Sequence, residues 1–310
     1  MDKPKVAFIV GPTGVGKTSL SLEIAEALNA EIISADSRYL YRGMDIGTAK
    51  PTQAELVRVP HYLVDVADVN ENWSLAEFHQ AAVTAMDRIL DKGKMPLIVG
   101  GTGQYIRALI EGWEVPARPP EPALREALTK WAEEIGGYEL HHRLVMLDPE
   151  AALLIDHRNV RRTIRALEVI FHTGELFSKQ RNRKPIGFVY KMAGLNRPRV
   201  ELYKRIDERI EAMITSGFVD EVRYLLDQGY SLENPPMSAI GYKEMITFLN
   251  DDCTLEESVV EIKRRTRQFV RRQANWFKDS DNRIRWFDVG RTLNDDIIDF
   301  FNGRDGWLEE

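Results

Sequence analysis

A glycine-rich loop near the N-terminus constrains the fold more than any other feature of this sequence. It lies between a short apolar segment, residues 6–10, and a segment typical of a helix, residues 19–28. Its residues fit the pattern G-x-x-x-x-G-K-[ST], which carries meaning only in that strand–loop–helix order. They are Gly11, Pro12, Thr13, Gly14, Val15, Gly16, Lys17 and Thr18. The sequence therefore predicts a phosphate-binding loop, called the phosphate loop below, at the end of the first strand.

Each part of the phosphate loop has a physical role in holding an anion. The glycines let the backbone curl so that successive N–H groups point at one ligand, and the following helix adds its positive end. Lys17 would place its charge on the terminal phosphate, and the Thr18 hydroxyl would bind Mg²⁺. The loop by itself does not say which phosphorylated ligand is bound, and ATP is the default interpretation.

Strands and helices alternate over the first third of the chain. Beyond the loop helix, apolar segments predict strands at residues 31–36, 61–65 and 96–100. A capping box of Ser74 and Glu77 opens a helix that runs to about residue 91. This alternation favours an α/β fold of the P-loop NTPase-like type, with a doubly wound parallel sheet. Ligands bind at the carboxyl ends of such strands, where the phosphate loop, Asp36 and residues 100–102 should converge.

A proline-rich segment at residues 116–122 interrupts this pattern, because it cannot form a helix interior or a central strand. We expect it to be a hinge into a helical insert that spans residues 116–185. Residues 188–195 then predict a strand that returns to the sheet, and residues 200–214 a helix with one apolar stripe. The remainder is expected to be mainly helical. The predicted core comprises residues 1–115 and 186–310.

Composition indicates a folded protein of a reducing compartment. Apolar residues make up 44% of the chain, and the single cysteine, Cys253, excludes an internal disulfide. Nothing reads as a signal peptide, and no apolar run approaches the ~20 residues that span a membrane. We therefore expect a cytoplasmic protein with no membrane partner. A monomer is expected because no heptad seam is visible.

The formal net charge of −6 hides two basic segments. Residues 158–184 hold eight basic residues against two acidic ones, and residues 263–272 hold six basic residues and no acidic one. Either segment alone can be a solvated helix face. The presence of two such segments makes binding of a polyanionic partner as well supported as that alternative. Phe269 and Trp276 accompany the second segment, and their helical spacing favours packing over base stacking.

Two aspartates follow predicted strands. Asp36 could hold Mg²⁺, hydrogen-bond a substrate or act as a general base; it could also merely cap the next turn. Asp65 is a competing Mg²⁺ ligand. Residues 43–51, with two glycines, a threonine and a lysine, predict a loop over the crevice, where substrate contact is favoured.

Arg205 and Arg209 lie one turn apart on the predicted 200–214 helix. Like charges at this spacing repel by about 0.2–0.5 kcal/mol unless an anion lies between them. Glu201 can pair with Arg205, but the residue four positions before Arg209 is Arg205 itself. Arg209 is therefore favoured as a phosphate clamp over a solvated side chain.

Together these residues resemble the tRNA dimethylallyltransferase (tRNA isopentenyltransferase) family over essentially the whole chain. The phosphate loop is shared with many kinases, whereas the string from Met44 to Pro51, MDIGTAKP, is far more specific. Gln104 departs from the family, which more often has leucine there. Arg38, often a small residue, departs where tRNA contact is implied. Further matching stretches are residues 33–37, 100–103, 165–169, 240–245 and 266–277.

The resemblance implies transfer of a dimethylallyl group from dimethylallyl diphosphate to N6 of the adenosine 3′ of the anticodon, in tRNAs that read codons beginning with U. The phosphate loop and Lys17 would hold the diphosphate, with Thr18 on Mg²⁺. Arg209 would neutralise the leaving group, and Asp36 would accept a proton from the amine.

The resemblance also implies contacts with the tRNA anticodon stem-loop, and it makes the helical insert a clamp on that stem-loop. The residues concerned are Asp36, Ser37, Arg38, Tyr39, Thr102, Arg125, Arg161, Arg162, Thr163, Ile164, Arg165, Ser238, Ala239, Ile240, Gly241, Tyr242 and Lys243.

Two other functions compete with this interpretation. An ATP-dependent small-molecule kinase would use the same phosphate loop but would have no need of an RNA-sized basic clamp. A nucleotide-switched RNA-binding protein would need a base-reading motif such as N-K-x-D, which does not occur in the sequence.

Overall fold

The structure, a computed structural model, describes residues 3–113, 121–179, 184–290 and 294–309. The chain forms two compact units, each described here by itself. The sheet unit comprises Met1–Ile110 and Ile186–Glu310, and the insert unit comprises Glu111–Pro185. The segment predicted as a hinge, residues 116–122, lies outside the described residues except for its last two.

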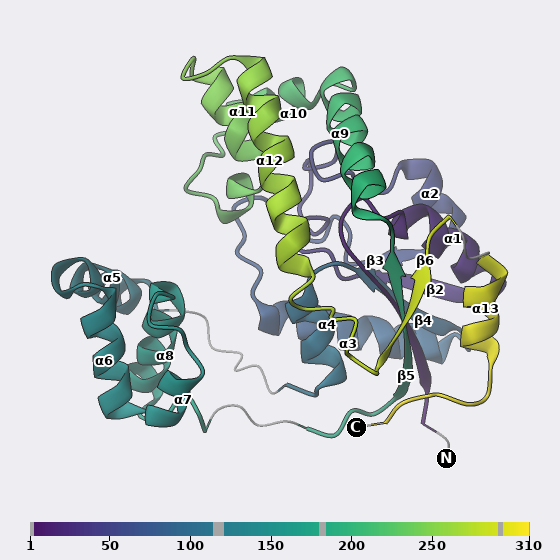
Figure 1. Ribbon diagram of the computed structural model, residues 1–310, viewed down its shortest axis with the longest axis horizontal. Coiled ribbons are helices and arrows are strands. Elements are labelled where there is room, and N and C mark those ends of the chain that lie inside the picture. The colour runs from purple at the N-terminus through teal and green to yellow at the C-terminus, as the bar shows by residue number, and fades with distance from the viewer. Residues whose placement is uncertain (1–2, 114–120, 180–183, 291–293, 310) are drawn as a thin grey trace. The chain divides into compact units, whose positions relative to one another are not determined.

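The sheet unit is built on six parallel strands in the order β3-β2-β4-β1-β5-β6 (Figure 1). This confirms the predicted doubly wound parallel sheet. Val10, the last residue of β1, pairs with Gly100, the last residue of β4, so these two strands end level with each other. Val10 also pairs with Gly194 of β5, which continues for two further residues. The strands are β1 (Lys5–Val10), β2 (Ala30–Ser34), β3 (His61–Tyr62), β4 (Met95–Gly100), β5 (Val189–Asn196) and β6 (Ile284–Asp288).

Two strands differ from the sequence prediction. β3 stops after two residues because Leu63 and Asp65 have positive φ angles of 61° and 54°, which an extended strand cannot hold. The described part of the chain after α9 (Arg199–Thr215) is mainly helical, as predicted, but the prediction did not include β6. The strand is short and forms the edge of the sheet, so only Ile284 and Phe287 are buried and its apolar signal is weak.

Helices cover both faces of the sheet. The chain moves from β1 to β2 and on to β3 in one direction, and from β3 back to β4 in the other, so right-handed crossovers place α1 and α3 on opposite faces. Figure 1 shows α1 and α13 on one side and α3 and α4 on the other. The predicted capping box of Ser74 and Glu77 is present at the start of α3. The bounds are α1 (Lys17–Ala27), α3 (Leu75–Asp91), α4 (Gly103–Ile110) and α13 (Asn294–Asn302).

A helical group extends beyond the carboxyl end of β5 (Figure 1). Within it α9 packs against α12 and α10, and α11 packs against both α10 and α12. The apolar stripe predicted for α9 is confirmed by the burial of Leu202, Ile206 and Ile210. The group comprises α9 (Arg199–Thr215), α10 (Phe218–Asp227), η1 (Pro235–Ser238), α11 (Tyr242–Leu249) and α12 (Leu255–Gln273); the short α2 (Gln53–Arg58) lies earlier in the chain. No helix in the described ranges is long and apolar enough to cross a membrane.

The insert unit is helical and has a hydrophobic core of its own. That core includes Leu128, Leu140, Leu144 and Leu167, which come from three helices and are almost fully buried. The helices are α5 (Pro122–Ile135), α6 (Gly137–Leu147), α7 (Pro149–Leu153) and α8 (Val160–Thr173). The unit can therefore hold its shape by its own packing.

A buried carboxylate joins two helices of the insert unit. Glu168 on α8 is 2% exposed at its side chain, and it accepts hydrogen bonds from Arg125 (2.7 Å) and Arg165 (3.0 Å). It also accepts the backbone N–H of Glu121 at 3.1 Å. Burial alone would raise the pKa of Glu168, but the two arginines outweigh burial and lower it. The guanidinium groups of Arg125 and Arg165 are thereby fixed in place.

We expect Glu168→Gln to destabilise the insert unit by about 2–4 kcal/mol, because an amide cannot satisfy two guanidinium groups. Chemical denaturation of the full chain measures this change. Glu126→Gln on α5 is the matched control, since Glu126 forms an exposed i,i+4 pair with Lys130 worth well under about 1 kcal/mol. Equal effects of the two substitutions would contradict the structural role of Glu168.

Candidate active site

The phosphate loop connects β1 to α1, as its sequence predicts. Gly14 and Gly16 have φ angles of 81° and 110°, in the left-handed region that glycine adopts without strain. A Cβ at Gly14 would also lie 2.8 Å from a side-chain carbon of Ile206, so α9 closes against the loop. No side chain caps α1 at Gly16, which leaves the first N–H groups of that helix available to an anion.

Lys17 lies inside the curve of the phosphate loop. Its Nζ donates hydrogen bonds to the carbonyl oxygens of Gly11 (3.0 Å) and Pro12 (2.9 Å). Burial lowers the pKa of Lys17 to about 8; the charge of Asp36 opposes this shift and that of Arg209 adds to it. Lys17 is therefore mostly charged at neutral pH.

Two arginines of α9 contact the same loop. Arg209 Nη2 donates to the Thr13 hydroxyl at 3.1 Å, and Arg205 Nε donates to the Gly14 carbonyl at 3.2 Å. Burial lowers the pKa of Arg209. The buried Nε of Arg209 has no hydrogen-bond partner among the described residues. The alternative pairing of Glu201 with Arg205 is not what the structure records, since Glu201 pairs with Arg197 at 3.2 Å.

Asp36 follows β2 and lies beside these cations. One of its carboxylate oxygens accepts the backbone N–H of Arg38 at 2.9 Å. Burial, and then the charge of Asp36, raise the pKa of the Tyr39 hydroxyl well above its usual value. A hydrogen bond with the Thr18 side chain and the charge of Arg209 oppose that rise. A carboxylate, a phenol and a phosphate-loop hydroxyl therefore meet at one place.

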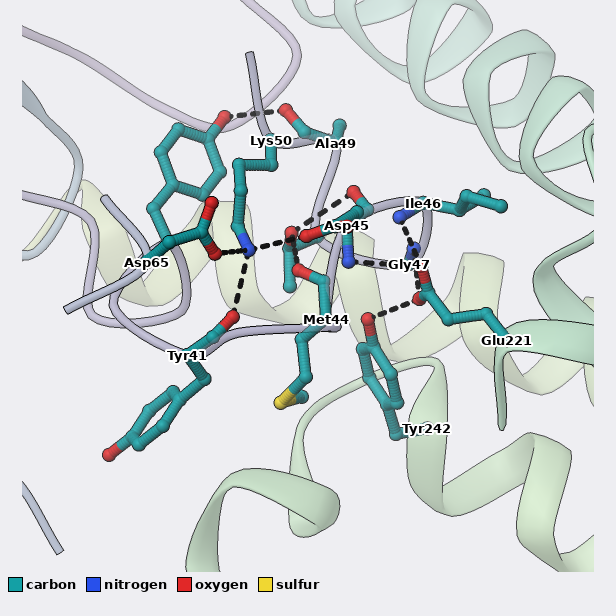
Figure 2. A network of polar contacts seen from close by, with 12 residues as sticks. Tyr41, Met44, Asp45, Ile46, Gly47, Ala49, Lys50, Asp65, Glu221 and Tyr242 are labelled. Carbon is teal, nitrogen blue, oxygen red and sulfur yellow. Dashed lines mark hydrogen bonds and ion pairs between the residues drawn. The ribbon is translucent and has the colours of Figure 1, made fainter. Parts of the chain in front are cut away.

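The segment from Met44 to Lys50, called the 44–50 loop below, is held by two charged groups (Figure 2). Glu221 on α10 accepts the backbone N–H groups of Asp45 (2.9 Å), Ile46 (2.6 Å) and Gly47 (3.1 Å). The same carboxylate accepts the hydroxyl of Tyr242, on α11, at 2.6 Å. The Glu221 carboxylate thus holds three consecutive N–H groups of the loop and, at the same time, the hydroxyl of Tyr242.

Lys50 is the second charged group that holds the 44–50 loop. Its side chain is 3% exposed, pairs with Asp45 and Asp65, and donates to the Tyr41 carbonyl at 2.8 Å (Figure 2). The Ala49 carbonyl accepts the Tyr39 hydroxyl at 2.7 Å, which links the loop to the site. Asp65, the competing Mg²⁺ ligand of the sequence prediction, is therefore engaged by Lys50.

The first comparison with known proteins concerns families. A family model described as IPP transferase matches residues 39–280, most of the chain. The chain belongs to this family.

Individual relatives agree with that assignment. A tRNA dimethylallyltransferase of Roseiflexus castenholzii (strain DSM 13941 / HLO8) is 49% identical over 274 residues, which cover 88% of this chain and 90% of the relative. The crystal structure of a tRNA isopentenylpyrophosphate transferase from Bacillus halodurans matches with a TM-score of 0.70 and 39% identity, over 97% of this chain and 95% of that one. A eukaryotic dimethylallyltransferase, described as acting on tRNA, matches with a TM-score of 0.79 and 29% identity, over 92% and 74%. The kinase alternative is not favoured.

Residues predicted to contact tRNA fall in both units of this IPP transferase. In the sheet unit, Ser37, Arg38 and Thr102 are half-buried near Asp36, and the Thr102 hydroxyl accepts the Ser37 N–H at 3.3 Å. Ser238 and Lys243 are exposed and Ile240 is half-buried, whereas Ala239, Gly241 and Tyr242 are buried. In the insert unit, Arg161 and Arg162 are exposed, Arg125 and Arg165 are half-buried, and Thr163 and Ile164 are buried.

The basic segment of α12 is less available than its composition suggests. Its first four basic residues form ion pairs with carboxylates of α9, α11 and α12 itself. Arg271 and Arg272 form no ion pair within the described part of the chain, and Arg272 lies over the Phe269 ring. Trp276 packs on Gly103, consistent with packing rather than base stacking. The ion-paired residues are Lys263, Arg264, Arg265 and Arg267.

Sequence reasoning did not identify Glu221. An acidic residue in the first turn of a helix is common, and nothing in the local sequence shows that its partners lie about 175 residues earlier. Glu221 nevertheless bears on the site, because it holds the 44–50 loop, and the Ala49 carbonyl of that loop accepts the Tyr39 hydroxyl.

Diphosphate affinity should fall as the pH rises through the pKa of Lys17, about 8. The charged amine favours an anionic ligand, so the dissociation constant of Mg²⁺–pyrophosphate should rise about tenfold per pH unit above that value. Isothermal titration calorimetry between pH 7 and 9.5 measures it. Lys17→Arg is the control, because its guanidinium stays charged and should flatten the profile. If the dissociation constant depends on pH equally in both proteins, the titration does not belong to Lys17.

Glu221→Gln should loosen the 44–50 loop, because an amide N–H₂ would face backbone N–H groups. We expect a loss of about 1–3 kcal/mol in stability and faster amide exchange at Asp45, Ile46 and Gly47. Hydrogen exchange with mass spectrometry and thermal unfolding measure both effects. Asp220→Asn on the same helix is the control, since the pair of Asp220 with Arg223 is exposed. Unchanged exchange in Glu221→Gln would overturn this account.

Proposed function

We propose that the protein transfers a dimethylallyl group from dimethylallyl diphosphate to N6 of the adenosine immediately 3′ of the anticodon, in tRNAs that read codons beginning with U. The observation that carries the proposal is the meeting of Asp36 and Tyr39 with Thr18 and Arg209. One place therefore offers both a proton acceptor and a cradle for a leaving anion. The family membership supports the same reaction.

The chain's own residues account for the bond changes. The allylic C–O bond breaks with its electron pair going to the diphosphate, and the N6 lone pair forms the new C–N bond. Lys17 and Arg209 stabilise the charge that develops on the departing diphosphate, which is the kind of contribution that usually dominates catalysis. Asp36 accepts the proton that leaves N6, and hydrogen bonding to that amine would select adenine.

Mg²⁺ is proposed as the metal cofactor. The donors available suit it, because the Thr18 hydroxyl and diphosphate oxygens are hard ligands, and Mg²⁺ keeps several waters when it binds phosphates. Asp65 is not proposed as a ligand, since one of its carboxylate oxygens already pairs with the ammonium group of Lys50. When bound, the ion would neutralise part of the diphosphate charge. Thr18 would hold it at the start of α1, beside Lys17.

The tRNA anticodon stem-loop is proposed as the partner of two surfaces. On the insert unit, Arg161 and Arg162 are exposed at the start of α8, where phosphate contacts are sequence-independent. On the sheet unit, Ser37, Arg38 and Thr102 border Asp36, where the target adenosine would be bound after leaving its stack. The buried Thr163, Ile164 and Tyr242 would support these surfaces rather than touch RNA with their side chains.

Incubation with radiolabelled dimethylallyl diphosphate, unmodified tRNA and Mg²⁺ tests the proposal. Label should enter the RNA with the wild-type protein, and Asp36→Asn should lower the rate by about 10²–10⁴-fold. Binding of the tRNA by Asp36→Asn, followed by gel shift, should change little. Absence of label in RNA with the wild-type protein would defeat the proposed function, and wild-type turnover by Asp36→Asn would defeat the role of Asp36.

A further inference from the structure

A buried amide on α12 joins two loops at the carboxyl edge of the sheet. The side chain of Gln273 accepts the backbone N–H of Thr13 at 2.9 Å through Oε1. Its Nε2 donates to the carbonyl oxygen of Gly101 at 3.0 Å. The residue is 5% exposed, so water cannot readily replace either bond. The phosphate loop and the loop after β4 are thereby held at a fixed separation.

Each of these loops leads to a group that the proposed reaction uses. On one side, the Thr13 hydroxyl accepts a hydrogen bond from Arg209. On the other, Thr102 follows Gly101 and donates its backbone N–H to the Ala35 carbonyl at 3.3 Å. The Thr102 hydroxyl also accepts the N–H of Ser37, so Thr102 bonds on both sides of Asp36. Gln273 therefore stands between the diphosphate cradle and the segment that carries Asp36.

We propose that Gln273 is a positioning residue that sets the distance between the diphosphate held by the phosphate loop and the carboxylate of Asp36. This inference rests on the proposed function, since it concerns the alignment of leaving group and proton acceptor in that reaction. Because the Thr13 N–H is used by Gln273, the diphosphate is held by loop N–H groups that follow Thr13.

Gly101 shows how closely the amide is fitted. A Cβ at Gly101 would lie 2.4 Å from Nε2 of Gln273 and 3.2 Å from the carbonyl oxygen of Gly11. Only a glycine leaves room for the amide at its observed position. Gly101→Ala would therefore displace the Gln273 side chain by changing its neighbour, while Gln273 itself stays unchanged.

The substitutions Gln273→Met and Gly101→Ala test the inference. Methionine has a similar length but neither bond, and a misplacement of about 1 Å can cost about 10²-fold in rate. We expect kcat to fall about 10–10²-fold in each variant, with a smaller change in the dissociation constant of Mg²⁺–pyrophosphate. The double variant should be no slower than the slower single variant, because both changes break one shared contact. Gln80→Glu, at an exposed position on α3, should match the wild type.

Gln273→Glu supplies a readout that a purely structural role would not give. A carboxylate still accepts the Thr13 N–H but cannot donate to the Gly101 carbonyl, whereas the protonated acid can do both. The ratio of its kcat to that of the wild type should therefore rise as the pH is lowered from 8 to 6. A constant ratio would overturn the role of the donated bond.

Amide hydrogen exchange without substrate separates this inference from the proposed function. In Gln273→Met, exchange at Thr13 and at Ser37 should accelerate about tenfold or more, while Gln80→Glu should show no change. If the wild type transfers no label to tRNA, the proposed function fails but the exchange result still decides the link between the loops. Unchanged exchange at both amides, or a kcat equal to that of the wild type, would overturn the inference.

Discussion

Positive charge crowded against a backbone loop is the constraint on which the rest of the site depends. Lys17 lies within the phosphate loop, and Arg209 reaches the same loop from α9. Burial lowers the pKa of both groups, which means that burial destabilises their charged forms. Asp36 offsets part of this cost but carries only one charge. In the proposed function, a diphosphate bound in the loop would supply the negative charge that balances these two cations.

Local features of the site could be predicted from the sequence, because each depends on a few adjacent residues. The phosphate loop, the capping box at Ser74 and the buried strands β1 and β4 are of this kind. The contacts of Glu221 and Gln273 could not be predicted, since their partners lie about 175 and 260 residues away and their own helices give no sign of them. β6 was missed for a related reason: an edge strand buries few side chains.

The number of basic residues in a segment also overstates the positive charge that a partner can contact in this protein. Arg264 and Arg267 belong to a segment with six basic residues and no acidic one, yet folding brings Glu261 and Asp207 against them. In the insert unit, Glu168 likewise holds Arg125 and Arg165, whereas Arg161 and Arg162 stay exposed. The charge that a polyanion can meet is therefore set by the tertiary pairing and is smaller than the sequence suggests.

The distance along the chain between Thr13 and Gln273 has a consequence for biosynthesis. The phosphate loop leaves the ribosome before α12, because the residue that supplies its amide support lies 260 residues further along the chain. At typical rates of about 5–20 residues per second, this delay is on the order of 10–50 s. For most of that interval the nascent chain carries a glycine-rich loop without its partners from α9, and for all of it without its partner from α12. The backbone N–H of Thr13 therefore acquires its Gln273 partner only after α12 has been made and has docked.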